Sequence, residues 1–268
     1  MGRTGQPAGG AGSPDRPDSP DRPDSPDRQP GRQPGRARRL LKSVGYGLVF
    51  AVPLTALAFV VREKFSPVID LDQRIIVAAT DLTRANPGLK SFLLFWQELT
   101  QPWRLYIVSS VVCLVVWRRH RELATRCLWA FVTLMVSWNL QLDIKQIVQR
   151  ARPIVTDPVD RAPGYSFPSG HVACAAAIAT TMTIFLWPLL STTWRRVLVA
   201  VMAVYVVVTS LDRVYLGVHF PSDVVGGILF GTGLATASYL GYLGWNPGPD
   251  DSPPPEGKVG PESSKGTT

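Results

Sequence analysis

The sequence has little cysteine and little histidine, and both shortages limit the chemistry open to it. Only three residues of each type occur among 268. Cys113, Cys127 and Cys174 all lie inside apolar runs, are odd in number and show no metal-type spacing. We therefore expect small apolar residues and no structural disulfide. No Cys/His set suits zinc and no acidic cluster suits magnesium, so we expect neither a metal nor another cofactor.

Long stretches of the sequence also lack charge, although the chain carries 28 Lys and Arg against 20 Asp and Glu. Uncharged runs cover residues 43–61, 172–190 and 224–243. Each run, as a helix, could cross a hydrocarbon core about 30 Å thick. Three shorter apolar runs can span with their flanks: 105–117, 127–142 and 197–211. The length of these runs disfavours a soluble protein with six buried helices. The sequence predicts an all-α integral membrane bundle of six transmembrane helices.

The two ends of the chain differ from this apolar middle. Residues 1–42 repeat SPDRPD, at 13–18 and 19–24, and have almost nothing apolar to bury. Residues 246–268 are rich in Pro, Gly and Ser. Such compositions predict disordered tails. The predicted organisation is a disordered tail over 1–42, a membrane domain over 43–245 and a second disordered tail over 246–268.

Basic residues indicate how the bundle sits in the membrane. A basic collar, defined by Arg36, Arg38, Arg39 and Lys42, precedes the first span. Lys and Arg favour the cytoplasmic side, which predicts a cytoplasmic N-terminus, although such a collar could also attract anionic lipid heads. The basic loops at 118–126 and 195–196 then lie on the same side. The opposite, extracytoplasmic face carries 62–103, 143–170 and 212–223, and within the first of these 71–99 reads as one helix, lying in the interface.

A first polar cluster on that outer face begins where the third span ends. Lys145 and Arg152 are seven residues apart, so they share a face if the helix persists. Pro153 biases Arg152 away from helix, so we expect the helix to end near Arg150. Two cations would then point into one region. Taken alone, the pair could simply be snorkelling side chains.

A second cluster opens the fourth span with Pro168-Ser169-Gly170-His171. A helix N-terminus presents free backbone N–H groups and is a ready anion site. Ser169 can add a hydroxyl donor, Gly170 lets an anion approach the backbone, and His171 could hand over a proton. A helix cap with an interfacial histidine is the alternative.

A third cluster, between the fifth and sixth spans, holds Asp212, Arg213, His219 and Asp223. Pro221 interrupts it, so we expect His219 to end a loop and Asp223 to open the last helix. A carboxylate that accepts from one imidazole nitrogen fixes the tautomer and leaves the other nitrogen free to attack. The alternative is an ordinary interfacial salt bridge.

All three clusters fall on one predicted face. Together they offer three cations, one helix N-terminus, two histidines and a carboxylate, which suits an anion with several oxygens, such as phosphate. Arg and Lys stabilise the oxygens of a phosphoryl group in transfer. One histidine could attack phosphorus while the other protonates the leaving oxygen.

The clusters resemble the three signature motifs of the type-2 phosphatidic acid phosphatase family, the lipid phosphate phosphatases. K-x6-R-P matches Lys145 to Pro153, P-S-G-H matches Pro168 to His171, and R-x5-H-x3-D matches Arg213 to Asp223. The resemblance covers about residues 45–243. It implies a six-helix membrane phosphatase with its active site at the outer face.

The resemblance also implies a role for each site residue. His219 would be the nucleophile and pass through a phosphohistidine, Asp223 would orient it, and His171 would be the general acid. The phosphoryl oxygens would be bound by Lys145, Arg152, Arg213, Ser169 and the Gly170 N–H. Asp212 departs from the family, which usually has serine there. Its carboxylate could hold Arg213 or compete with phosphate for it, and our hypothesis is that it points away from the site.

The substrate is open at this point. Polyprenyl diphosphate, phosphatidic acid and phosphatidylglycerol phosphate all fit, because the tail-binding surface is generic apolar sequence. A non-catalytic protein that binds or transports anionic lipids is an alternative, as is a vanadium-dependent haloperoxidase, although the proteins of that class are soluble. We expect lipid phosphate and the bilayer as partners and no nucleic acid, and the oligomeric state stays open. Gly227 and Gly231 form G-x-x-x-G, which favours close packing within the chain over dimerisation.

Overall fold

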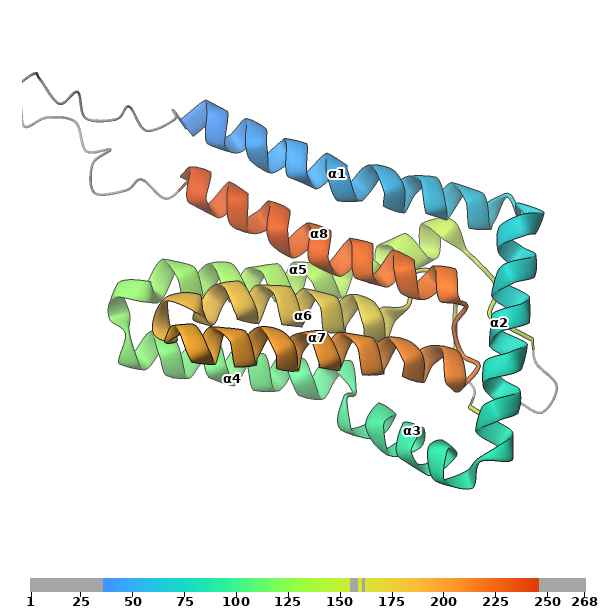
Figure 1. The fold of residues 1–268 in the computed structure, drawn as a ribbon. Coiled ribbons are helices and arrows are strands. Elements are labelled where there is room, and N and C mark those ends of the chain that lie inside the picture. The colour runs from blue at the N-terminus through green and yellow to red at the C-terminus, as the bar shows by residue number, and fades with distance from the viewer. Residues whose placement is uncertain (1–35, 155–158, 161, 246–268) are drawn as a thin grey trace, which may run out of the picture. The chain divides into compact units, whose positions relative to one another are not determined.

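The computed structural model describes residues 36–154, 159–160 and 162–245 (Figure 1). Helices and two short 3₁₀ turns are the regular structure of this part of the chain, which contains no strand. The elements are α1 (Arg36–Arg62), α2 (Ser66–Ala85), α3 (Pro87–Leu99), α4 (Pro102–Arg119), η1 (Arg121–Leu123), α5 (Ala124–Val148), α6 (Gly170–Leu186), η2 (Trp187–Leu189), α7 (Thr192–Tyr215) and α8 (Pro221–Trp245).

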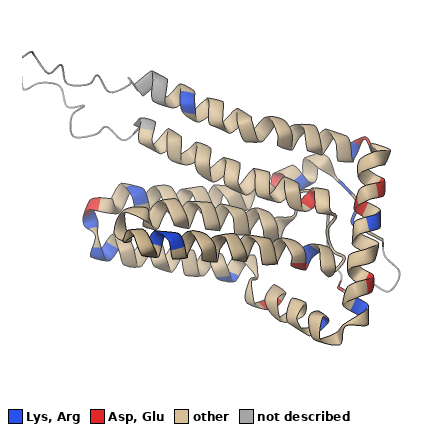
Figure 2. Cartoon of the chain, in the orientation of Figure 1, with Lys and Arg blue, Asp and Glu red and all other residues tan. Residues whose placement is uncertain are grey.

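The predicted membrane bundle is confirmed. Within the described residues, α1, α6, α7 and α8 and the stretch from η1 through α5 are each long and apolar enough to cross a membrane. A sixth span arises if α3 and α4, bent by 46° at their junction, count as one. Charged residues gather near the helix ends and along α2, and the helix middles are largely uncharged (Figure 2). Each predicted apolar run therefore lies in its own helix.

Two boundary predictions are wrong. The single helix expected over 71–99 is two helices, because Pro87 disfavours helical geometry at Asn86, which is extended at φ −127° and ψ 92°. Helix α1 begins at Arg36, inside the predicted N-terminal tail, since residues 36–42 contain no proline and mostly good helix formers. The rest of that predicted tail and the predicted C-terminal tail lie outside the described residues.

Helix α6 is the inner helix of the bundle. Of its apolar stretch 61% is buried, against 6% for α1, which leaves most of α1 to face lipid. Residues 172–179 of α6 are small or β-branched and mostly inaccessible, and α6 packs against α5, α7 and α8. In a bilayer, where apolar burial contributes little to helix association, small side chains let backbones approach closely.

Gly227 and Gly231 make this close approach possible on α8, within the chain as expected. A Cβ atom added to Gly227 would lie 2.9 Å from the Ser169 carbonyl oxygen. One added to Gly231 would lie 2.7 Å from the Ala177 nitrogen and closer still to the Ala173 carbonyl oxygen. The contact holds the start of α6 against the start of α8, where Ser169 N–H donates to the Asp223 carbonyl at 3.0 Å.

Gly231→Ala should therefore destabilise the fold even though alanine is the better helix former. Overpacking against backbone atoms costs about 1–3 kcal/mol, which lowers the thermal midpoint by roughly 2–10 °C in a chain of this size. Gly45→Ala on α1 is the matched control, because a Cβ there meets nothing within 4 Å. Unfolding in detergent measures both; equal midpoints for the two variants would contradict the packing argument.

Candidate active site

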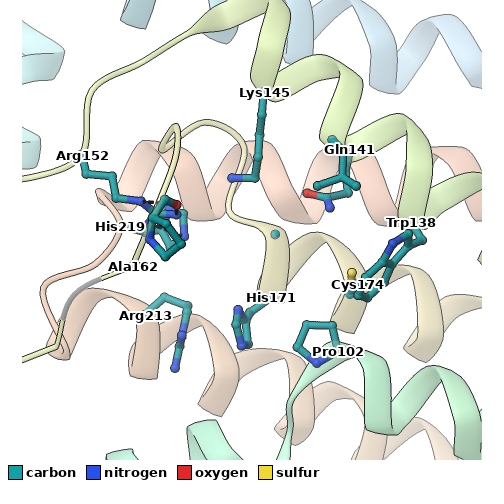
Figure 3. Close-up of a pocket in the computed structure, with 13 residues that line it drawn as sticks. Pro102, Trp138, Gln141, Lys145, Arg152, Ala162, His171, Cys174, Arg213 and His219 are labelled. Atoms are coloured by element: carbon teal, nitrogen blue, oxygen red, sulfur yellow. Dashed lines mark hydrogen bonds between the residues drawn. The ribbon is translucent and has the colours of Figure 1, made fainter.

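The three sequence clusters meet in one pocket of about 250 Å³ (Figure 3). The lining residues of α5, α6 and α7 belong to the helix ends nearest to α2 (Figure 1). Six of the eight predicted site residues line it: Lys145, Arg152, Gly170, His171, Arg213 and His219. Ser169 and Asp223 are fully buried behind this lining. The remaining wall is largely apolar and includes Pro102, Trp138 and Leu142.

His219 lies in the short loop between α7 and α8, where Gly217 has a positive φ of 77°. Its Nδ1 is 3.5 Å from Asp223 Oδ2, and its Nε2 is 3.1 Å from Arg152 Nη1. A guanidinium only donates, so Nε2 must accept. We therefore assign the proton of the neutral ring to Nδ1, facing Asp223, which leaves the Nε2 lone pair on the pocket side.

Burial keeps this imidazole neutral. It lowers the pKa of His219 to about 4, and Lys145 and Arg152 also lower it, whereas the nearby Asp223 carboxylate raises it. A neutral imidazole with an available Nε2 lone pair is the form that can act as a nucleophile.

Asp223, in the first turn of α8, is held by donors on both oxygens. Its Oδ2 accepts from Phe220 N–H at 2.9 Å and from the Ser166 hydroxyl. Its Oδ1 accepts from Arg150 Nη1 at 2.6 Å. A buried carboxylate needs such partners, and here they also fix its orientation toward His219.

Lys145 and Arg152 line the same pocket without sharing a helical face, because the helix ends before Arg152, as expected from Pro153. Helix α5 ends at Val148 and Gln149 adopts a left-handed φ of 53°, which redirects the chain. Arg152 reaches the pocket from the loop that follows. Burial lowers the pKa of Arg152, the more so because Arg213 is nearby, although Asp223 opposes the shift.

Backbone carbonyls of the loop before α6 hold both cations. Lys145 Nζ donates to the Pro168 carbonyl at 2.7 Å and to the Tyr165 carbonyl at 3.1 Å. Arg152 donates to the carbonyls of Pro163, Gly164 and Val218. The loop thereby fixes two positive charges beside His219.

The start of α6 carries two buried polar atoms that have no hydrogen-bond partner within the described residues. They are Ser169 Oγ, at the N-cap, and His171 Nε2. Buried polar groups are normally paired, so unpaired ones at a pocket are candidates for contact with a ligand. Gly170 lies between them and lines the pocket with its backbone.

Asp212 does not line the pocket but holds Arg213. Its Oδ2 accepts from Arg213 Nε at 2.7 Å and also from Arg213 Nη2. Both residues are buried, so each compensates the charge of the other. In Figure 3 the Arg213 side chain extends away from His219. Asp212 thus holds one of the three site cations.

Several residues of the site were missed. Gln141 lines the pocket one helical turn before Lys145, and its buried Oε1 has no hydrogen-bond partner among the residues that the structure describes. Asp72, Arg150, Ser166 and Ser222 form a buried polar network behind Asp223. Gln141 could have been found as a polar residue four positions before Lys145 on an apolar helix. The network members carry no comparable local signal. Over the described part of the chain no group of three or more His, Cys, Asp or Glu side chains is arranged to hold a metal.

The chain is similar in sequence to a known protein family and to several phosphatases. Residues 126–246 match the sequence profile of the PAP2 superfamily. The chain is 37% identical over 91 residues to phosphatidylglycerophosphatase B of Bacillus subtilis (strain 168), covering 33% of this chain and 44% of that protein. It is 30% identical over 136 residues to an undecaprenyl-diphosphatase of Sulfolobus acidocaldarius, covering 49% and 61%. The chain thus spans about half the length of these two relatives.

A solved structure shares the fold. It is a transmembrane PAP2 type phosphatidylglycerolphosphate phosphatase from Bacillus subtilis, with a TM-score of 0.65 and 23% identity. The match covers 72% of this chain and 94% of that chain. At this identity the likeness supports the arrangement of the helices, and the chemistry has to be argued from the residues themselves.

Asp212→Ser should strengthen the binding of inorganic phosphate about tenfold, because the substitution removes a buried carboxylate that competes with an anion for Arg213. Isothermal titration calorimetry on detergent-purified protein measures this. Asp81→Ser is the matched control, since Asp81 pairs with Arg84 at an exposed position on α2. Unchanged or weaker binding by folded Asp212→Ser and Asp212→Asn would show that the carboxylate does not compete.

Proposed function

The chain carries a PAP2 superfamily domain, and on that premise we propose that it hydrolyses a phosphomonoester or diphosphate on a lipid head group. The reaction proceeds through a phosphohistidine and needs no metal. One observation carries the proposal: His219 presents Nε2 to a pocket lined by cations while its Nδ1 faces the buried Asp223. A protein that merely binds or transports anionic lipids would use the cations but would have no need of this pair.

In the first step the phosphoryl group is bound by Lys145, Arg152 and Arg213. Arg152 Nη1 then donates to a phosphoryl oxygen instead of to His219 Nε2, which frees the lone pair of Nε2. Nε2 then forms a bond to phosphorus as the bond to the leaving oxygen breaks. The leaving oxygen takes a proton from His171, which enters this step as an imidazolium and leaves it neutral. Asp223 stabilises the imidazolium that results, because its carboxylate faces the Nδ1 proton.

In the second step a water molecule attacks the phosphohistidine. His171 takes a proton from this water, the phosphorus–nitrogen bond breaks, and inorganic phosphate leaves. His219 returns to its neutral form. Ser169 Oγ and the Gly170 N–H stabilise the phosphoryl oxygens in both steps, since they present donors at a helix N-terminus.

The names of the relatives support a lipid phosphate as the substrate. Their names are a phosphatidylglycerophosphatase and an undecaprenyl-diphosphatase, and both kinds of substrate join a phosphate to a long apolar tail. Pro102, Trp138 and Leu142 form the apolar wall of the pocket, on α4 and α5. This wall suits the first carbons of a lipid tail, while the cations suit the phosphate.

Purified protein should release phosphate, with a chelator present, from at least one of polyprenyl diphosphate, phosphatidic acid and phosphatidylglycerol phosphate. His219→Ala should lower kcat by about 10³-fold or more, as expected for loss of a nucleophile. His120→Ala is the matched control, because His120 is exposed and pairs with Glu122 far from the pocket.

Two outcomes would contradict the proposal in different ways. If folded wild-type protein releases phosphate from none of the three lipids, the chain is not a phosphatase of this class. If His219→Ala releases phosphate as fast as His120→Ala, hydrolysis occurs but does not pass through a phosphohistidine at His219.

We further propose that the pocket opens at the extracytoplasmic face. The basic residues around η1 and at Arg195 and Arg196 lie at the opposite end of the bundle (Figures 1 and 2). Short basic loops favour the cytoplasm. In this orientation the pocket can receive the head groups of lipid carriers from outside the cell.

A thiol reagent that does not cross membranes tests the orientation on intact cells. The native cysteines are buried, so they give little background. Gly88→Cys, at the junction of α2 and α3 on the pocket side, should be labelled, and Glu122→Cys, in η1, should be labelled only after lysis. The reverse pattern would put the pocket on the cytoplasmic side.

A further inference from the structure

A chain of buried charges lies behind the pocket, and two of its three members, Asp72 and Arg150, take no part in the steps above. Arg150 Nη2 is 2.7 Å from Asp72 Oδ2, and Arg150 Nη1 is 2.6 Å from Asp223 Oδ1. The three side chains are at most 5% exposed. Burying charges in this way is expensive and contributes little net stability. The arrangement therefore calls for an explanation beyond stability.

Asp72 also caps the helix that carries Asp223. Its Oδ1 accepts from the backbone N–H of Ser222 at 3.0 Å, and its Oδ2 accepts from the Ser222 hydroxyl. Ser222 is the second residue of α8, so a carboxylate from α2 satisfies an N–H group that a helix start leaves free. The position of Asp223 is thereby tied to α2, which runs across the ends of α7 and α8 (Figure 1).

Arg150 makes a second connection, to the loop that holds the nucleophile. Its Cζ lies 4.3 Å from the centre of the Phe220 ring, and Phe220 directly follows His219. The Arg150 carbonyl accepts from Ser166 N–H at 2.8 Å, and Ser166 in turn donates to Asp223. Arg150 thus contacts Asp223 directly, through Ser166 and through Phe220.

We propose that Asp72 and Arg150 are positioning residues for the reaction at His219: together they fix the orientation of Asp223 and the charge behind the imidazole. The proposal rests on the proposed function, in which His219 becomes cationic. Two carboxylates and one guanidinium sum to one negative charge, on the opposite side of His219 from the pocket cations. That charge stabilises the imidazolium formed when Nε2 bonds to phosphorus.

This charge balance predicts that substitutions of Arg150 and Asp72 shift the pKa of His219 in opposite directions. Arg150→Met leaves two negative charges behind His219 and should raise its pKa. Asp72→Asn leaves none in sum and should lower it. The double variant restores one negative charge and should return the pKa toward that of the wild type. The other charged or titratable groups that line the pocket with His219 are the same in all variants: Lys145 on α5, Arg152 in the following loop, His171 on α6 and Arg213 on α7.

The pKa of His219 can be followed by NMR of labelled histidine, because the chain has three histidines and His219→Ala assigns the signal. The wild-type pKa should lie near 4. The proton affinity of His219 should rise about tenfold or more in Arg150→Met and should fall in Asp72→Asn. Asp81→Asn, on the exposed face of α2, is the matched control and should leave it unchanged.

This measurement does not depend on turnover, so it separates the two proposals. Absence of phosphatase activity in the wild type would overturn the proposed function and leave the titration readable. Shifts of the same sign in folded Arg150→Met and Asp72→Asn, or no shift in either, would overturn the positioning role. Where Arg150→Met does not fold, Arg150→Lys keeps the charge and should retain the wild-type pKa of His219. The shift measured in Asp72→Asn then decides whether the positioning role holds.

In turnover assays kcat of Asp72→Asn should fall about 10- to 100-fold, the scale of a small misplacement of a catalytic group. KM should change little, because Asp72 does not line the pocket. A rise in KM with kcat unchanged would assign Asp72 to substrate binding and overturn its positioning role.

Discussion

The buried carboxylate of Asp223 is the point on which the rest of the site depends. Its side chain is contacted from the loop after α5 by Arg150 and Ser166, and from the loop before α8 by Phe220 and His219. Its carbonyl accepts from Ser169, where α6 begins. A buried carboxylate must be satisfied by protein donors, and here those donors come from the loop between α5 and α6 and from the loop before α8. The side chain and the carbonyl of Asp223 together thus bring residues of all three motifs into contact.

The cations of the pocket are held by a different means. Lys145 and Arg152 donate to carbonyls of the segment that leads into α6, so their charges are fixed before any anion arrives. Fixed charges need no reorganisation when a phosphoryl group develops its transition-state charge. The same contacts oblige an incoming phosphate to compete with backbone carbonyls, which moderates its ground-state affinity. Weak ground-state binding favours turnover, because only interactions that strengthen in the transition state accelerate the reaction.

The sequence was informative wherever a local property sufficed. Uncharged runs located the spans, and Pro221 correctly separated His219 from the helix that begins at residue 221. It could not supply what tertiary contacts decide. Lys145 and Arg152 converge as expected, but they do so because Gln149 turns the chain and backbone carbonyls bind Arg152. Asp72 and Arg150 are 78 residues apart, and an acid in an amphipathic helix reads as an ordinary surface charge until α2 is seen packed on α8.

Asp212 shows how a single position can adjust a rigid site of this kind. Because Lys145, Arg152 and Asp223 are each held by several partners, the site cannot readily move them. Arg213 is the cation whose partner is one neighbouring carboxylate. Where serine occupies that position, as is usual in the family that the motifs resemble, Arg213 has no such competitor. An aspartate there lowers the positive charge that a phosphate would meet, so we expect it to weaken the binding of both substrate and product in the proposed reaction. Because free phosphate is the second product of that reaction, we expect the change to favour product release, and it does so without moving His219.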